Sequence, residues 1–287
     1  CGTALSSYVS APITSAATSP INSQLVTAMV DSMATYFVVN KPEYIVRVTN
    51  NNPGFTVLTA AGVQPILAVG DAHVWIPDDQ GEWKPRDDVW IWYMGKTGAL
   101  DVGFASPADR FGPELQFGHV VGDALDEQVL LIKIAWGGKS RAVDFRPPSA
   151  GGERGPYYDE IFTHTKAVLD ELETHFPKAK GMRPEIAGLI WFQGWNDRVN
   201  QVHNDEYGSN LAHLIRDVRA QFELPKLPFV IGETGQGGPD EKHPRALSLM
   251  RHQADVAALK EFKGTVRLAR TTPCYADEPR HDGGYHF

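Results

Sequence analysis

The stretch IAGLIWFQGWND, residues 186–197, begins as an apolar run and ends in a glycine, a tryptophan, an amide and an acid. An apolar run without alternation is typical of a strand that is buried on both faces of a parallel sheet. Ligands of such sheets bind at the carboxyl ends of the strands. The polar residues that close this run therefore mark a candidate site as well as a strand.

Apolar, strand-like runs alternate with amphipathic helical segments on both sides of this stretch. We expect strands within residues 128–136, 186–193, 227–233 and 264–271, and helices within 156–176, 204–222 and 246–262. This alternation predicts right-handed crossovers and a parallel sheet in an α/β fold. Upstream, the sequence predicts a further strand within 81–95 and a helix over 111–125, with Pro113 near its first turn.

The first 40 residues differ from the rest in composition, with Asp31 as their single charged residue and twelve serines or threonines. We expect residues 1–40 to form a low-charge leader, and residues 41–287 to form a single domain. The start does not have the basic segment and apolar run of a signal peptide. Cys1 is compatible with an arbitrary chain start or with a lipoprotein anchor, and the expected location is extracytoplasmic or secreted.

Overall composition narrows the class of protein. The chain has 287 residues, 42% of them hydrophobic and 22% charged, which is ordinary for a globular protein. A net charge of -8 argues against nucleic acid as a partner, because phosphate binding favours a basic face. The longest apolar runs are too short to span a membrane.

The C-terminal segment RHDGGYHF offers a base for acyl transfer. His286 is the candidate base and Asp282 the carboxylate that would orient it, with glycines between them that let the chain turn. His281 and Asp277 are rival assignments. The alternative interpretation is an exposed histidine in a tail.

Donors for an oxyanion are the second requirement of acyl transfer. The candidates are the backbone N–H groups of Gly137 and Gly138 and the side-chain amide of Asn196, with Gly194 helping to form the cradle. Each residue taken singly also fits a turn or a cap. Together, at the ends of two strands, they favour a site.

Two tryptophans at strand ends, Trp136 and Trp195, either stack on a sugar or pack against the protein. We expect them, together with Gln193 and Asp197, to contact substrate. The sequence contains no HExxH, no zinc spacing of Cys and His, no GxGxxG and no Walker A loop. We therefore expect neither a metal nor a cofactor.

Three segments, IKIAWGGKSRAVDFRPPS, LIWFQGWNDRVN and DGGYHF, resemble the SGNH hydrolases, in the branch of sialate O-acetylesterase-like and acetylxylan-esterase-like carbohydrate esterases. The resemblance covers residues 81–287. It implies a three-layer α/β/α sandwich of flavodoxin-like type and a serine acyl-enzyme that removes O-acetyl or similar small acyl esters from carbohydrates. Its glycine, G-x-N-D and closing Asp/His blocks match Gly137–Gly138, Gly194–Asp197 and Asp282/His286, the last pair with three intervening residues where two are commoner.

The nucleophile is the point where the chain departs from this family. The family's serine lies in an early G-Q-S-N motif, and no such motif occurs here. Ser23 is a weak candidate and Ser32 is another, whereas Ser140 follows the glycine block at a position that the resemblance implies is structural. The alternative functions are a catalytically impaired carbohydrate-binding relative or fragment without the nucleophile, and a glycosidase that uses paired carboxylates drawn from Glu233, Asp197 and Asp240.

Overall fold

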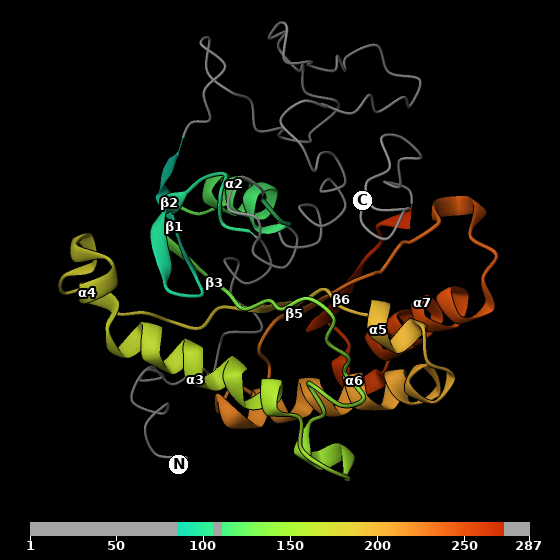
Figure 1. Ribbon diagram of the computed structural model, residues 1–287. Coiled ribbons are helices and arrows are strands. Elements are labelled where there is room, and N and C mark those ends of the chain that lie inside the picture. The colour runs from blue at the N-terminus through green and yellow to red at the C-terminus, as the bar shows by residue number, and fades with distance from the viewer. Residues whose placement is uncertain (1–84, 106–110, 273–287) are drawn as a thin grey trace, which may run out of the picture. The chain divides into compact units, whose positions relative to one another are not determined.

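The computed structural model describes residues 85–105 and 111–272, which Figure 1 draws as coloured ribbons. These residues fall into two units. One unit contains Ile134–Thr234 and Glu241–Ala269. The other contains the described residues up to Lys133, together with Gly235–Asp240 and residues 270–272. The expected leader, and the strand-like runs before residue 81, lie outside the described residues.

The unit that contains Lys133 is built on a three-stranded sheet in the order β2-β1-β3. Strands β1 (Arg86–Tyr93) and β2 (Lys96–Leu100) form an antiparallel hairpin, and helix α2 (Glu114–Ala124) leads to β3 (Val129–Lys133), which is parallel to β1. Met94 and Gly95 both have positive φ values, 49° and 90°, as a tight two-residue hairpin turn requires.

The sheet of the other unit is entirely parallel, in the order β4-β5-β6. Its strands are β4 (Leu189–Trp191), β5 (Phe229–Gly232) and β6 (Val266–Ala269). All four residues of the central strand β5 are buried, so both faces of that strand are covered. This burial explains why the sequence of β5 is continuously apolar.

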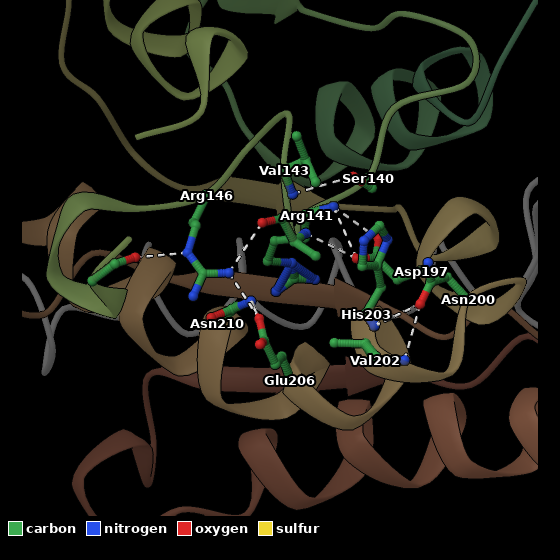
Figure 2. Close-up of polar contacts among 12 residues, drawn as sticks. Ser140, Arg141, Val143, Arg146, Asp197, Asn200, Val202, His203, Glu206 and Asn210 are labelled. Atoms are coloured by element: carbon green, nitrogen blue, oxygen red, sulfur yellow. Dashed lines mark hydrogen bonds and ion pairs between the residues drawn. The ribbon is translucent and has the colours of Figure 1, made fainter. Parts of the chain in front are cut away.

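Helices precede and connect these strands. Their bounds are α3 (Pro156–Asp170), α4 (Leu172–His175), α5 (Trp195–Arg198), α6 (Gln201–Gln221) and α7 (Pro244–Ala257), with short 3₁₀ turns η2 (Pro148–Ala150), η3 (Pro177–Ala179), η4 (Gly238–Asp240) and η5 (Lys260–Phe262). The Asn200 side chain caps α6 by accepting hydrogen bonds from the N–H groups of Val202 and His203, at 2.9 and 3.3 Å (Figure 2). Apolar stripes of α3, α6 and α7 form one core with β4, β5 and β6.

The α/β class and the mostly parallel pairing predicted from the sequence are confirmed. The strands are shorter than predicted, since pairing within the run 128–136 covers only Val129–Lys133. In the described part of the chain the strands form two three-stranded sheets, where the alternation alone indicated one. No helix in the described ranges combines the length and apolar character needed to cross a bilayer.

Candidate active site

Two loops far apart in sequence meet at one buried carboxylate. We call residues 136–142 the glycine loop and residues 193–197 the Gln193 loop. The carboxylate of Asp197 accepts hydrogen bonds from the Arg141 N–H, at 2.8 and 3.1 Å, and from the Ala142 N–H, at 2.9 Å (Figure 2). Asp197 is fully buried. Hydrogen bonds to an ionised acceptor are among the stronger ones, so this contact fixes one loop on the other.

Gln193 adds a second connection between the same loops. Its Nε2 donates to Asp197 Oδ2 at 2.6 Å and to the Lys139 carbonyl oxygen at 3.0 Å. The Asp197 carboxylate thus accepts hydrogen bonds from the backbone of the glycine loop and from the side chain of Gln193. From the sequence we expect Gln193 and Asp197 to contact substrate. In the structure, Gln193 Nε2 and the Asp197 carboxylate bond to the glycine loop.

Gly138 and Asn196 lie next to each other across the two loops. A Cβ atom placed on Gly138 would be 3.8 Å from Asn196 Nδ2, and Gly138 has φ +71°, a conformation that favours glycine. At Gly137 the same position faces open space. The Asn196 side chain makes no hydrogen bond to any residue that the structure describes. The predicted donors Gly138 and Asn196 are therefore brought together.

Gly194 has a steric role. A Cβ atom at this position would be 2.5 Å from both Leu249 Cδ2 and Thr234 Cγ2, closer than real side chains approach. The Gly194 carbonyl also accepts the N–H groups of Asp197 and Arg198, at 3.1 and 2.9 Å, which starts the short helix α5. The glycine that interrupts the stretch at 194 thus allows the turn from β4 into α5 against α7.

Both candidate tryptophans are half-buried and have aromatic or cationic neighbours. Trp136 packs edge-on against Tyr157, with ring centroids 4.7 Å apart, and Lys139 Nζ lies 4.2 Å above the same Tyr157 ring. The Arg198 guanidinium lies 4.4 Å above the Trp195 ring. Stacking of either tryptophan on a sugar remains a prediction.

Ser140 and Asp144 brace the glycine loop from its far end. The Ser140 N–H and Oγ donate to Asp144 Oδ2 at 2.8 and 3.1 Å, and Lys139 Nζ lies 3.4 Å from Oδ1. Burial alone would raise the pKa of Asp144, but these contacts with Ser140 and Lys139 bring that pKa below its ordinary value. Ser140 is itself buried, and its hydroxyl also accepts the Val143 N–H at 3.2 Å.

Arg141 is a residue of this site that the sequence analysis missed. It is fully buried, and its guanidinium lies 3.9 Å from the centre of the Tyr207 ring and 5.2 Å from that of Trp191. Within the described residues its three guanidinium nitrogens have no hydrogen-bond partner. An arginine between a serine and an alanine in a polar segment gives no sequence signal for burial in an aromatic sandwich.

The remaining predicted residues lie elsewhere. Ser23, Ser32, His286, Asp282 and the rivals His281 and Asp277 are outside the described residues, so their roles stay predictions. Of the glycosidase candidates, Asp197 serves the glycine loop, Glu233 is buried directly after β5, and Asp240 is exposed at the end of η4. No group of three or more His, Cys, Asp or Glu suited to a metal occurs among the described residues.

The glycine loop and the Gln193 loop thus meet within a parallel α/β unit, and comparison with known proteins identifies the family of the chain. Residues 61–269 match the model of the family described as carbohydrate esterase, sialic acid-specific acetylesterase. The chain belongs to this family. The resemblance to carbohydrate esterases predicted from the motifs is thereby confirmed.

Individual relatives are more distant. The chain is 26% identical over 135 residues to the probable carbohydrate esterase At4g34215 of Arabidopsis thaliana, an alignment that spans 44% of this chain and 43% of that protein. A crystal structure of At4g34215 covers 71% of this chain and 74% of its own, with 18% identity and a TM-score of 0.49. The carbohydrate acetylesterase XAC1771 of Xanthomonas citri covers 65% of this chain and 43% of its own, with 16% identity and a TM-score of 0.44.

Proposed function

We propose that this protein hydrolyses O-acetyl or similar small acyl esters of carbohydrates through a serine acyl-enzyme. The observation that carries the proposal is the approach of Gly138 to the Asn196 amide, which has no hydrogen-bond partner in the described part of the chain. An amide and a backbone N–H are donors that do not titrate, and donors of this kind stabilise the oxyanion of a tetrahedral intermediate. Membership of the carbohydrate esterase family supports the same reaction class.

In this proposal a serine of the N-terminal third attacks the acyl carbonyl and transfers its proton to His286, which Asp282 orients. The carbonyl oxygen becomes an oxyanion that accepts hydrogen bonds from the Asn196 amide and from the Gly138 or Gly137 N–H. Collapse of this adduct expels the sugar alkoxide, which takes the proton from His286. Water, activated by the same histidine, then releases acetate and restores the serine.

The structure supports a division of labour inside the Gln193 loop. The Asn196 amide makes no hydrogen bond to the described residues. In contrast, Gln193 Nε2 and the Asp197 carboxylate bond to the glycine loop, while Gln193 Oε1 is buried without a partner among the described residues. We therefore assign Asn196 to the oxyanion, and Gln193 and Asp197 to holding the two loops together. This assignment replaces the substrate contact first expected of Gln193 and Asp197.

The test is acetate release from an acetylated sugar by the wild type and by Asn196→Ala. Loss of one oxyanion donor typically lowers kcat on the order of 10²–10³-fold, and we expect a fall of this size. Val199→Ala, three residues along at an exposed position, is the matched control and should retain activity. Unchanged acetate release by Asn196→Ala would show that the oxyanion site is elsewhere.

The absent G-Q-S-N motif favours a second candidate, a carbohydrate-binding relative without a nucleophile. A fluorophosphonate probe separates the two. Stoichiometric labelling of one serine supports the esterase. Sugar binding by calorimetry, with no labelling and no acetate release from folded protein, supports the binding protein instead.

A further inference from the structure

Gln253 is a polar residue on the otherwise apolar face of α7. Ala246, Leu249 and Val256 share that face at helical spacing and are buried, and Gln253 is fully buried among them. A buried amide is costly unless its donors and acceptor are satisfied. What it contacts therefore indicates why an apolar side chain does not occupy this position.

The Gln253 side chain connects the carboxyl end of β5 to α6. Its Oε1 accepts the Thr234 N–H at 3.0 Å. Its Nε2 donates to the Gly232 carbonyl at 3.2 Å and to the Tyr207 hydroxyl oxygen at 3.2 Å. Gly232 is the last residue of β5, so this contact fixes where the strand stops.

The same cluster reaches the carboxyl end of β4. The Tyr207 hydroxyl donates to the Gln193 carbonyl at 2.6 Å, and Gln253 Nε2 lies 3.4 Å from that oxygen. In a trans peptide the C=O and the following N–H point to opposite sides. Holding the Gln193 carbonyl toward Tyr207 and Gln253 thus fixes the plane of the Gln193–Gly194 peptide and the direction in which the Gln193 loop leaves β4.

Steric contact closes the cluster from the same side. The position of a Gly194 Cβ would lie 2.5 Å from Leu249 Cδ2, one helical turn before Gln253 on α7, and 3.7 Å from Gln253 Nε2. Gly194 is therefore set against α7 by packing, and its preceding peptide by hydrogen bonds. Asn196 follows two residues later, and its amide bonds to none of the residues that the structure describes.

We propose that Gln253 is a positioning residue of the esterase reaction: it holds the Gln193 loop so that the Asn196 amide meets the oxyanion. This role rests on the proposed function, because positioning matters for kcat only if the Gln193 loop stabilises a transition state. Gln253 is itself fully buried and is not exposed to a ligand. It acts through Tyr207, the Gln193 carbonyl and Gly194.

The experiment compares Gln253→Leu with Asn204→Leu. Asn204 is also fully buried and donates to the Arg245 carbonyl at 2.8 Å, so it joins α6 to α7, and its side chain makes no hydrogen bond to the Gln193 loop. Both variants should lose thermal stability. Only Gln253→Leu should lower kcat, on the order of 10²-fold, because displacement of a catalytic group by about 1 Å costs this much. KM should stay within about threefold, since the substrate's ground-state contacts remain.

Equal falls in kcat for both variants, or unchanged kcat in Gln253→Leu, would overturn the proposal. Should Gln253→Leu not fold, Tyr207→Phe removes one hydroxyl that donates to the Gln193 carbonyl and keeps the ring beside Arg141. That variant should lower kcat about tenfold with KM unchanged, and wild-type kcat in Tyr207→Phe would also overturn the proposal.

A separate measurement distinguishes failure of this inference from failure of the proposed function. The side-chain amide of Asn196 and the backbone amide of Gly194 give resonances in a ¹H–¹⁵N spectrum whether or not the protein cleaves esters. Both resonances should shift in Gln253→Leu and keep their wild-type positions in Asn204→Leu. If the wild type releases no acetate while these shifts occur, the esterase proposal fails but the positioning stands; absence of the shifts contradicts the positioning itself.

Discussion

The two sides of the Gln193 loop differ in how their polar groups are used. On one side, Asn196 lies beside Gly138 with an amide that makes no hydrogen bond to the described residues. On the other, the Asp197 carboxylate and the Gln253 amide are fully buried, and both are engaged by the protein. Asn196 and Asp197 are adjacent in helix α5, yet among the described residues only the side chain of Asp197 is hydrogen-bonded to the protein.

This contrast separates residues that are available to a ligand from residues that hold the site in place. A buried carboxylate without donors would cost several kcal/mol, so Asp197 is explained by folding alone. The Asn196 amide makes no hydrogen bond to the described residues, so we expect it to contribute little to the stability of the fold. A residue that stability does not require, at the end of a strand where ligands bind, is a good candidate for function.

The largest effect we expect comes from Asp197→Ala. This substitution leaves the Arg141 and Ala142 N–H groups and the Gln193 amide without their acceptor, and each unsatisfied buried group costs about 1–3 kcal/mol. The free energy of unfolding should fall by about 3–5 kcal/mol. Urea denaturation measures it. Asn196→Ala, the neighbouring control, should stay within about 0.5 kcal/mol of the wild type.

The distinction between Asn196 and Asp197 would be wrong if Asn196→Ala lost much stability and Asp197→Ala lost little. A large loss of stability in Asn196→Ala would mean that its amide has a structural partner. A loss below about 1 kcal/mol in Asp197→Ala would mean that other acceptors replace the carboxylate, so that it does not hold the glycine loop.

A smaller loss of stability should come from substituting Gly194, which is packed against neighbouring side chains, whereas Gly137 faces open space. Gly194→Ala places a methyl group 2.5 Å from Leu249 and Thr234 side-chain atoms, and overpacking of this kind costs about 1–3 kcal/mol. At Gly137 a Cβ has no neighbour within 4 Å, so Gly137→Ala should change stability by less than about 0.5 kcal/mol. Thermal unfolding of both variants checks the difference. Equal losses would mean that packing against α7 does not exclude a side chain at position 194.

Much of the fold follows from periodicity in the sequence. The apolar stripe of α6 lies within the segment 204–222, and the uninterrupted apolar run 227–233 contains β5 with all its residues buried. The two glycine-containing clusters could also be located, because residues after buried strands collect at a sheet edge. In the structure the two clusters are in contact, because Asp197 accepts hydrogen bonds from the backbone of the glycine loop.

What periodicity does not supply is the function of single polar residues inside a helix or loop. Gln253 interrupts the apolar stripe of α7, which is a visible signal, but the stripe does not reveal that its partners are Tyr207 and the end of β5. From the sequence alone Asp197 resembles a surface acid, because the backbone N–H groups that bind it lie 55 and 56 residues away. Such contacts depend on tertiary structure, and no local pattern encodes them.

The smallest effect, and the only one that depends on pH, concerns Asp144 at the far end of the glycine loop. Contacts with Ser140 and Lys139 outweigh burial and place its folded pKa below the ordinary value of 3.8. A carboxyl group with a lowered folded pKa stabilises the protein above the unfolded pKa, and this contribution is lost as the pH falls through the folded pKa. Because the side chain is 22% exposed and its partner Lys139 is 26% exposed, screening limits the contribution to less than about 1 kcal/mol. Asp144→Asn should therefore be less stable than the wild type near neutral pH, and urea denaturation in acid, below pH 3.8, should show a smaller difference between the two. A difference that is the same at both pH values would mean that the Ser140 hydrogen bonds act through geometry alone and that the charge of Asp144 does not stabilise the glycine loop.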